Sequence, residues 1–210
     1  MEENKVQKNN FIKENYLLGI ASLLLCIFIV ILVCVVNGNT AKFDSTIFNY
    51  IASFRGNTLT VILKNITEFG NWKVISVIGI VLIIALKKKE KIAILINSTI
   101  PIITNLIIKN IVRRPRPLED LRLVEEDGFS FPSGHAISTI TFYGFLIYLV
   151  LKNVKNKVLK IILTIILSVL ILCIGISRIY LGVHYASDIL AGLVLGVCFL
   201  LVLIHIYRKK

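Results

Sequence analysis

Residues 17–36 form an uninterrupted run without a charged side chain, and this run constrains the fold more than any other sequence feature. About 20 apolar residues are enough to cross the hydrocarbon core of a bilayer as an α-helix. Polar sequence without a small-residue cleavage signature follows the run. We therefore interpret it as a membrane anchor rather than a removed signal peptide.

Further apolar runs follow along the chain, at 72–86, 92–108, 136–151, 161–176 and 189–207. The apolar fraction of 56% exceeds the roughly 45–50% of ordinary soluble domains. Because a backbone in lipid must satisfy its own hydrogen bonds, runs of this length form helices. The run at 72–86 is short, and we expect it to extend back past Lys73, whose stem can reach the interface. The sequence predicts an all-α, six-transmembrane-helix bundle, with residues 1–210 as a single integral-membrane domain.

The positive charge of the chain is unevenly placed. The net charge is +12, and 14 of the 24 lysines and arginines fall on one side of a six-span layout, at the N-terminus, around 87–91 and 152–160, and in the closing Arg-Lys-Lys. The positive-inside rule then places both termini in the cytoplasm, and the connections 37–71, 109–135 and 177–188 outside a multi-pass protein of the cytoplasmic membrane. Lysines beside apolar spans favour anionic membrane lipids as partners, and do not favour nucleic acid.

Two smaller patterns concern packing. Residues Phe43, Ile47, Ile51 and Phe54 recur at helical spacing, which predicts a short amphipathic helix on the outer surface. The cysteines all fall within predicted spans without CxxC spacing, so we interpret them as packing residues: Cys26, Cys34, Cys173 and Cys198.

The connection that begins at Lys109 is rich in cations on the side where topology disfavours them. Arg116 is followed by Pro117, which stiffens the chain and would hold the guanidinium in a fixed direction. Such a fork can grip phosphate oxygens with two hydrogen bonds. The alternative is a stop signal, in which cations and proline end the third span.

Pro132, Ser133, Gly134 and His135 come directly before the fourth span. A helix start with a hydroxyl and a position without a side chain is suited to binding an anion. The alternative is an ordinary N-cap formed by Ser133. His135 favours chemistry here, because an imidazole at an anion site can transfer a proton near neutral pH.

A third group, at Ser177, Arg178, His184 and Asp188, precedes the last span. His184 and Asp188 are four residues apart, so on a helix they share a face and can hydrogen-bond. A carboxylate on one ring nitrogen frees the other for attack. The alternative is a structural pair, and Ser177 fits either a helix terminus or the anion clamp. His205 and the acidic residues 125–127 are interpreted as an interfacial side chain and a solvated loop.

The three groups resemble the signature of the type 2 phosphatidic acid phosphatase (PAP2) family, whose superfamily includes vanadium-dependent haloperoxidases. The matching motifs are K-x6-RP from Lys109, PSGH from Pro132 and SR-x5-H-x3-D from Ser177. They lie within 109–188, and the similarity in architecture covers nearly the whole chain. Arg114 is interpreted as a decoy, because only Arg116 has the family spacing from Lys109.

The resemblance implies a PAP2/haloperoxidase-like core and a phosphatase acting on a lipid phosphate or diphosphate at the outer membrane face. It implies that His184 is the nucleophile, that Asp188 orients its ring and that His135 protonates the departing alcohol. The phosphoryl oxygens would be held by Lys109, Arg116, Arg178, Ser133 and the Gly134 backbone. No cofactor and no metal are implied, because fixed cations can stabilise the transition-state charge.

The sequence leaves three alternatives to hydrolysis open. The same pocket could transfer the phosphoryl group to an acceptor alcohol, or hold vanadate as a haloperoxidase does. A non-enzymatic anion or lipid transporter would explain the arginines, but it gives no reason for the pairing of His184 with Asp188 opposite His135.

Overall fold

A computed structural model describes residues 2–209 of the chain, and every regular element in that range is helical. The elements are α1 (Glu2–Val36), α2 (Ala41–Ala52), α3 (Asn57–Glu68), α4 (Trp72–Ala85), α5 (Lys88–Val112), the 3-10 helix η1 (Glu119–Leu121), α6 (Gly134–Asn153), α7 (Lys157–Tyr180) and α8 (Ala186–Lys209). The predicted all-α fold is confirmed.

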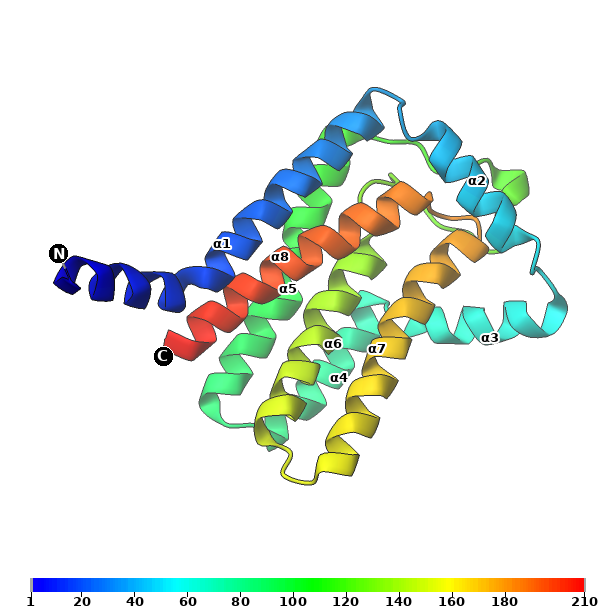
Figure 1. The fold of residues 1–210 in the computed structure, drawn as a ribbon. Coiled ribbons are helices and arrows are strands. Elements are labelled where there is room, and N and C mark those ends of the chain that lie inside the picture. The colour runs from blue at the N-terminus through cyan, green and yellow to red at the C-terminus, as the bar shows by residue number, and fades with distance from the viewer. Residues whose placement is uncertain (1, 210) are drawn as a thin grey trace.

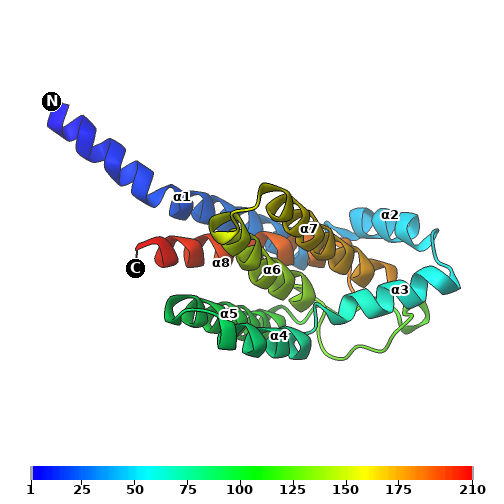
Figure 2. The same ribbon diagram turned by 90° about the horizontal axis from the view of Figure 1, so that it is seen from below.

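Helix α6 lies in the middle of the bundle. It packs against α5, α7 and α8, while α1 lies along the outer side of α8 (Figure 1). Seen from below, the N-terminal part of α1 projects beyond the other helices (Figure 2). The start of α6 and the start of α8 are therefore held side by side.

The number of predicted spans agrees with the structure, but the second predicted span does not follow the expected path. Five helices are long and apolar enough to cross a membrane, and α3 with α4 supplies a sixth if this bent pair is one span. The expected extension past Lys73 occurs only as a bent pair, because α4 begins at Trp72 and the chain bends by 52° into α3. Asn71 caps α4 by accepting a hydrogen bond of 3.1 Å from the Lys73 N–H.

The connections fall into two sets at opposite ends of the bundle. The segments 37–40, 113–133 and 181–185 lie at one end, and the lysine-rich turns between α4 and α5 and between α6 and α7 lie at the other (Figure 1). The two-sided layout is confirmed, while the side that faces the cytoplasm stays a prediction. The side chains of Lys5, Lys8 and Lys13, and the whole of Lys210, lie outside the described residues.

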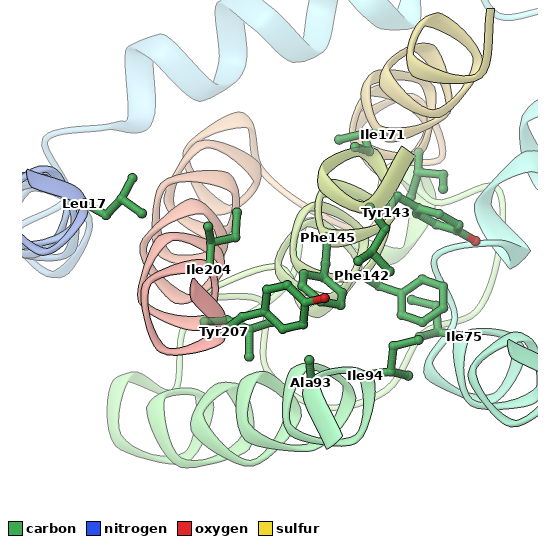
Figure 3. Packing of buried hydrophobic residues seen from close by; sticks show 13 residues of the cluster. Leu17, Ile75, Ala93, Ile94, Phe142, Tyr143, Phe145, Ile171, Ile204 and Tyr207 are labelled. Atoms are coloured by element: carbon green, nitrogen blue, oxygen red, sulfur yellow. The ribbon is translucent and has the colours of Figure 1, made fainter. Parts of the chain in front are cut away.

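Aromatic and branched side chains fill the space between α4, α5, α6 and α8. Figure 3 shows Phe142 facing Ile75 and Ile94, with Phe145 beside Tyr207. The last two rings meet edge to face with centroids 5.7 Å apart, an arrangement that stabilises beyond simple burial. This core fixes α6 against its neighbours. The four cysteines are free, and the packing interpretation fits the buried Cys198 but not Cys26, which is exposed on the outside of the bundle.

The predicted amphipathic helix is present as α2. Ile47 and Ile51 pack against buried residues of α6, α7 and α8, whereas Phe43 and Phe54 are exposed. The helix also carries Asp44, whose side chain is only 3% exposed. Helix α2 is thus packed onto the end of the bundle that holds the sequence motifs.

Candidate active site

The three sequence motifs meet at one end of the bundle. Lys109 lies near the end of α5, His135 in the first turn of α6, and His184 between α7 and α8. These three residues and Gly134 line a single cavity of about 460 Å³. The predicted convergence of two imidazoles and a lysine is therefore present in the structure.

His184 and Asp188 form a buried pair. The His184 Nδ1 atom is 3.3 Å from the Asp188 Oδ2 atom, and the two residues are 2% and 0% exposed. The expected geometry of one shared helix face is wrong, because His184 lies before α8, which begins at Ala186. The contact forms because the Tyr185 N–H donates to Asp188 at 2.9 Å, which folds the loop over the first turn of the helix.

The other ring nitrogen of His184, Nε2, contacts a cation, and no carboxylate of the described residues is bonded to it. Its Nε2 atom is 3.3 Å from Nη1 of Arg116. Burial, with the charges of Arg116 and Arg178, lowers the pKa of His184 to about 4 against the opposing effect of Asp188. The imidazole is therefore neutral at pH 7, with Nδ1–H donated to Asp188 and a lone pair on Nε2.

Backbone carbonyls hold two of the cations. The Arg116 guanidinium donates to the carbonyl oxygens of Asp127, at 2.9 Å, and of Val183, at 2.9 Å, while Lys109 Nζ donates to the Phe129 oxygen at 2.7 Å. These bonds fix the segment 127–129 and the turn before His184 around the cations. The positions of the charges are thus set by the folded backbone before any anion binds.

The start of α6 has the geometry of a capped helix. The Ser133 hydroxyl accepts a hydrogen bond of 3.4 Å from the Ala136 N–H, which agrees with the N-cap alternative, and Ser133 is fully buried. Gly134 is the first helical residue, so its N–H has no partner within the helix. Asn105 supports this turn by donating to the Pro132 oxygen at 3.0 Å, and it lines the cavity.

We expected from the sequence that Glu126 belongs to a solvated loop, but its side chain contacts two arginines. Its neighbours Glu125 and Asp127 are exposed, but the Glu126 carboxylate pairs with Arg178 and lies 3.7 Å from Nη2 of Arg116. Burial raises its pKa, but the charge and hydrogen bond of Arg178 outweigh this and keep the pKa below its ordinary value. The sequence could have indicated this pairing, because a cluster of cations such as that around Lys109 favours a carboxylate nearby.

Glu126 separates the two arginines from the cavity. Of the described residues, it is Glu126, and not Arg116 or Arg178, that lines the cavity. Each arginine side chain is only 3% exposed. The Nε atom of Arg178 is also buried and has no hydrogen-bond partner among the described residues. A donor thus remains available at this position.

Sequence reasoning also missed two contacts of Asp188 and one ion pair behind them. Ser130 donates its hydroxyl to Asp188, and Arg114, interpreted as a decoy, forms an ion pair of 2.6 Å with the same carboxylate. Arg114 in turn pairs with Asp44 at 2.7 Å. Only tertiary folding brings these positions together, and no spacing rule in the sequence links them.

Two further residues lie away from the cavity. The Ser177 hydroxyl donates to the Ile174 oxygen at 2.7 Å, and the residue is fully buried, which favours the helix-terminus interpretation over the clamp. His205 lies near the far end of α8 from Asp188. Neither side chain is among the described residues that line the cavity.

Comparison with known sequences identifies the family. The profile of the PAP2 superfamily matches residues 91–210, which include all three motifs and more than half of the chain. The chain belongs to the PAP2 superfamily.

Curated PAP2 relatives match over part of their length. Phosphatidylglycerophosphatase B of Bacillus subtilis (strain 168) is 38% identical over 96 residues, which cover 44% of this chain and 45% of that protein. Lipid phosphate phosphatase delta of Arabidopsis thaliana is 32% identical over 104 residues, which cover 44% of this chain and 25% of that protein. The matches thus span less than half the length of either relative.

Solved PAP2 structures match over most of the fold. The crystal structure of a transmembrane PAP2 type phosphatidylglycerolphosphate phosphatase from Bacillus subtilis superposes with a TM-score of 0.79 at 26% identity, covering 90% of this chain and 96% of that chain. Aquifex aeolicus LpxE gives a TM-score of 0.65 at 24% identity, covering 80% and 96%, which supports the fold alone. The helical membrane bundle is thus the fold of this PAP2 protein.

Proposed function

We propose that this chain is a membrane-embedded phosphatase that removes phosphate from a lipid through a phosphohistidine intermediate. The Nε2 lone pair of His184 attacks phosphorus, and the bond between phosphorus and the lipid oxygen breaks. Protonated His135 gives its proton to the departing alkoxide. Neutral His135 then takes a proton from water, whose oxygen attacks phosphorus and breaks the P–N bond, so that phosphate leaves and both histidines return to their starting states.

The surrounding donors would stabilise the charge on the phosphoryl oxygens. Lys109 and Gly134 line the cavity, and Arg116 and Arg178 would reach the phosphate once Glu126 moves aside. The unpaired Nε of Arg178 offers one such donor. Ser133 would contribute chiefly by capping α6, which aims the free N–H of Gly134 at the anion. Such preorganised donors account for much of phosphoryl-transfer catalysis.

The apolar wall of the cavity supports a lipid as the substrate. Beside the polar residues it is lined by Trp72, Ile102 and Leu106, and Trp72 and Leu106 are 56% and 55% exposed on the outer surface of the helices. A lipid could therefore place its phosphate at His184 while its chains remain in the bilayer. The names of the two Bacillus subtilis relatives favour phosphatidylglycerophosphate as the first substrate to test. Phosphatidate and undecaprenyl diphosphate follow, with the site on the extracytoplasmic face.

The observation that carries this proposal is one cavity lined by both His135 and His184, with the latter tied to Asp188. The test is phosphate release by purified protein from a panel of lipid phosphates in detergent with EDTA. We expect release by the wild type, loss by at least a thousandfold in His184→Ala, and near-normal rates in His205→Gln, which changes a histidine at the far end of α8. Full activity of His184→Ala would mean that His184 is not the nucleophile. Phosphate found on an added alcohol would indicate a transferase.

A further inference from the structure

A guanidinium that is 14% exposed bridges two carboxylates behind the His184–Asp188 pair. Arg114 Nη1 lies 2.6 Å from Asp188 Oδ1, and Nη2 lies 2.7 Å from Asp44 Oδ2. Asp44 comes from α2 and Asp188 from the first turn of α8. One side chain from the loop after α5 thus connects two acidic residues from different parts of the chain.

Ser187 closes this network. Its N–H donates to Asp44 Oδ1 at 2.8 Å and its hydroxyl donates to Asp44 Oδ2 at 2.8 Å. Arg114 Nη1 donates to the same hydroxyl oxygen at 2.8 Å. All of these groups are largely buried, so the bonds are little weakened by solvent. Helix α2 is thereby joined to the turn of α8 that carries Asp188.

The two oxygens of Asp188 have separate partners. Oδ2 accepts from the Tyr185 N–H, from the Ser130 hydroxyl and from His184. Oδ1 accepts from Arg114. The carboxylate is held at both ends, and the rotation that would turn it away from the His184 ring is blocked by Arg114.

Arg114 is not among the described residues that line the phosphate cavity. It lines a second cavity of about 530 Å³ together with Asp44, Tyr185 and an edge of His184. Its guanidinium carbon is 4.1 Å from the centre of the Tyr185 ring. A change at Arg114 therefore removes no direct contact with the lipid phosphate and acts on the site only through Asp188.

We propose that Arg114, held by Asp44, is a positioning residue that fixes Asp188 and limits the negative charge that Asp188 presents to His184. This proposal rests on the proposed role of His184 as the nucleophile. A carboxylate shared with a cation stabilises an imidazolium less than an unpaired carboxylate does. The pair therefore keeps Nε2 unprotonated while it still orients the ring.

The pH dependence of His184 depends on every charge that faces it. Arg116 and Arg178 oppose its protonation, and Asp188 favours it. The remaining charged or titratable neighbours are Arg114 and Asp44 behind the carboxylate, Tyr185 beside it, and Glu126, Lys109 and His135 at the cavity. Removing only the Arg114 charge strengthens the effect of Asp188, so the pKa of His184 rises.

The experiment measures phosphate release from a short-chain phosphatidate in detergent, as kcat and KM from pH 4 to 8. For Arg114→Met we expect kcat to fall 10- to 100-fold, KM to stay within about twofold, and the acid limb of kcat/KM to move to higher pH by half a unit or more. Arg114→Lys should recover part of kcat, and Asp44→Asn should shift kcat and the acid limb in the same direction by less. Arg113→Met, at the exposed neighbouring residue, should match the wild type.

Three results would overturn the proposal. A rise in KM with kcat retained would make Arg114 a substrate ligand. The role of Arg114 would be structural only if kcat fell while the acid limb stayed in place in both Arg114→Met and Asp44→Asn, and Arg114→Lys recovered no activity. Wild-type kinetics in a folded Arg114→Met would exclude any role. The proposed function fails separately, through an inactive wild type or an active His184→Ala.

Discussion

Alanine in place of Gly192 tests whether the spacing of α6 and α8 sets the geometry of the site. Gly192 lies on α8 one turn after Asp188, and a Cβ atom there would lie 2.8 Å from the Ala136 Cβ and 2.8 Å from the Ser133 carbonyl oxygen. Neither atom can rotate away, because one belongs to the backbone and the other is fixed to it. The start of α6 must therefore move away from α8.

The size of this movement follows from the contact distances. Ordinary contacts of a Cβ atom begin at 3.4 Å, so α6 has to retreat by about 0.6 Å, a figure set by the hard packing of interiors. His135 moves with α6, while Asp188 and the adjacent His184 stay with α8. Since a misplacement of about 1 Å can cost about 100-fold in rate, we expect kcat of Gly192→Ala to fall about 10- to 50-fold. Overpacking should also cost about 1–3 kcal/mol of stability.

The assay is kcat for a short-chain lipid phosphate, with the unfolding temperature measured in the same detergent. Gly144→Ala is the first control, because its added Cβ meets only the flexible end of Leu200, from the same α6–α8 interface; it should lose stability but keep kcat. Gly19→Ala is the second, since no described atom outside its own helix turn lies within 4 Å of the added Cβ; it should keep kcat and lose no stability. Wild-type kcat in Gly192→Ala would mean that the spacing of α6 and α8 does not set the geometry of the site.

Two further predictions concern charge in the cavity. Glu126→Gln should lower the inhibition constant of inorganic phosphate about tenfold, because the Glu126 carboxylate repels the bound phosphate. Two like charges about 5 Å apart repel by about 3 kcal/mol at an effective dielectric constant of about 20. The side chain of Glu126 is 29% exposed, and solvent screening reduces this repulsion to about half. A raised constant would instead mean that Glu126 aligns Arg116 and Arg178 for binding. The second prediction is that His184 makes stability depend on pH. The pKa of His184 is 6.5 in the unfolded chain and about 4 in the folded protein, so the unfolded chain binds more protons between these pH values. The contribution of His184 to stability is therefore fully present above pH 6.5 and is lost as the pH falls towards 4. The unfolding temperature of His184→Gln should fall less over that range than that of the wild type, and parallel curves would contradict this pKa.

The spans and the site motifs were predictable because their signals are local or follow from a known signature. An uncharged run such as 17–36 identifies a helix wherever it packs, and six spans bring the connections that hold Lys109, His135 and His184 to one end of the bundle. Family resemblance supplied the roles of these residues, and the structure supplies the shared cavity.

The remaining features depend on contacts between distant positions. Asp44 and Asp188 are joined through Arg114 only because α2 folds back over the end of the bundle. The sequence shows an apolar stripe on α2 but gives no sign that its carboxylate points inward. Likewise α3 leaves the direction of α4 by 52° and packs against α7, a contact between distant positions that no periodicity within 57–85 records.

Direct detection of the phosphorylated protein tests whether His184 is the nucleophile. Purified protein is mixed with a saturating short-chain lipid phosphate, quenched within milliseconds in alkali, which preserves phosphohistidine, and digested for mass spectrometry. We predict one phosphoryl group on His184, absent from His184→Ala and from wild type after the substrate is exhausted. Phosphate attached to a different residue, or no phosphorylated protein while phosphate is being released, would contradict the account.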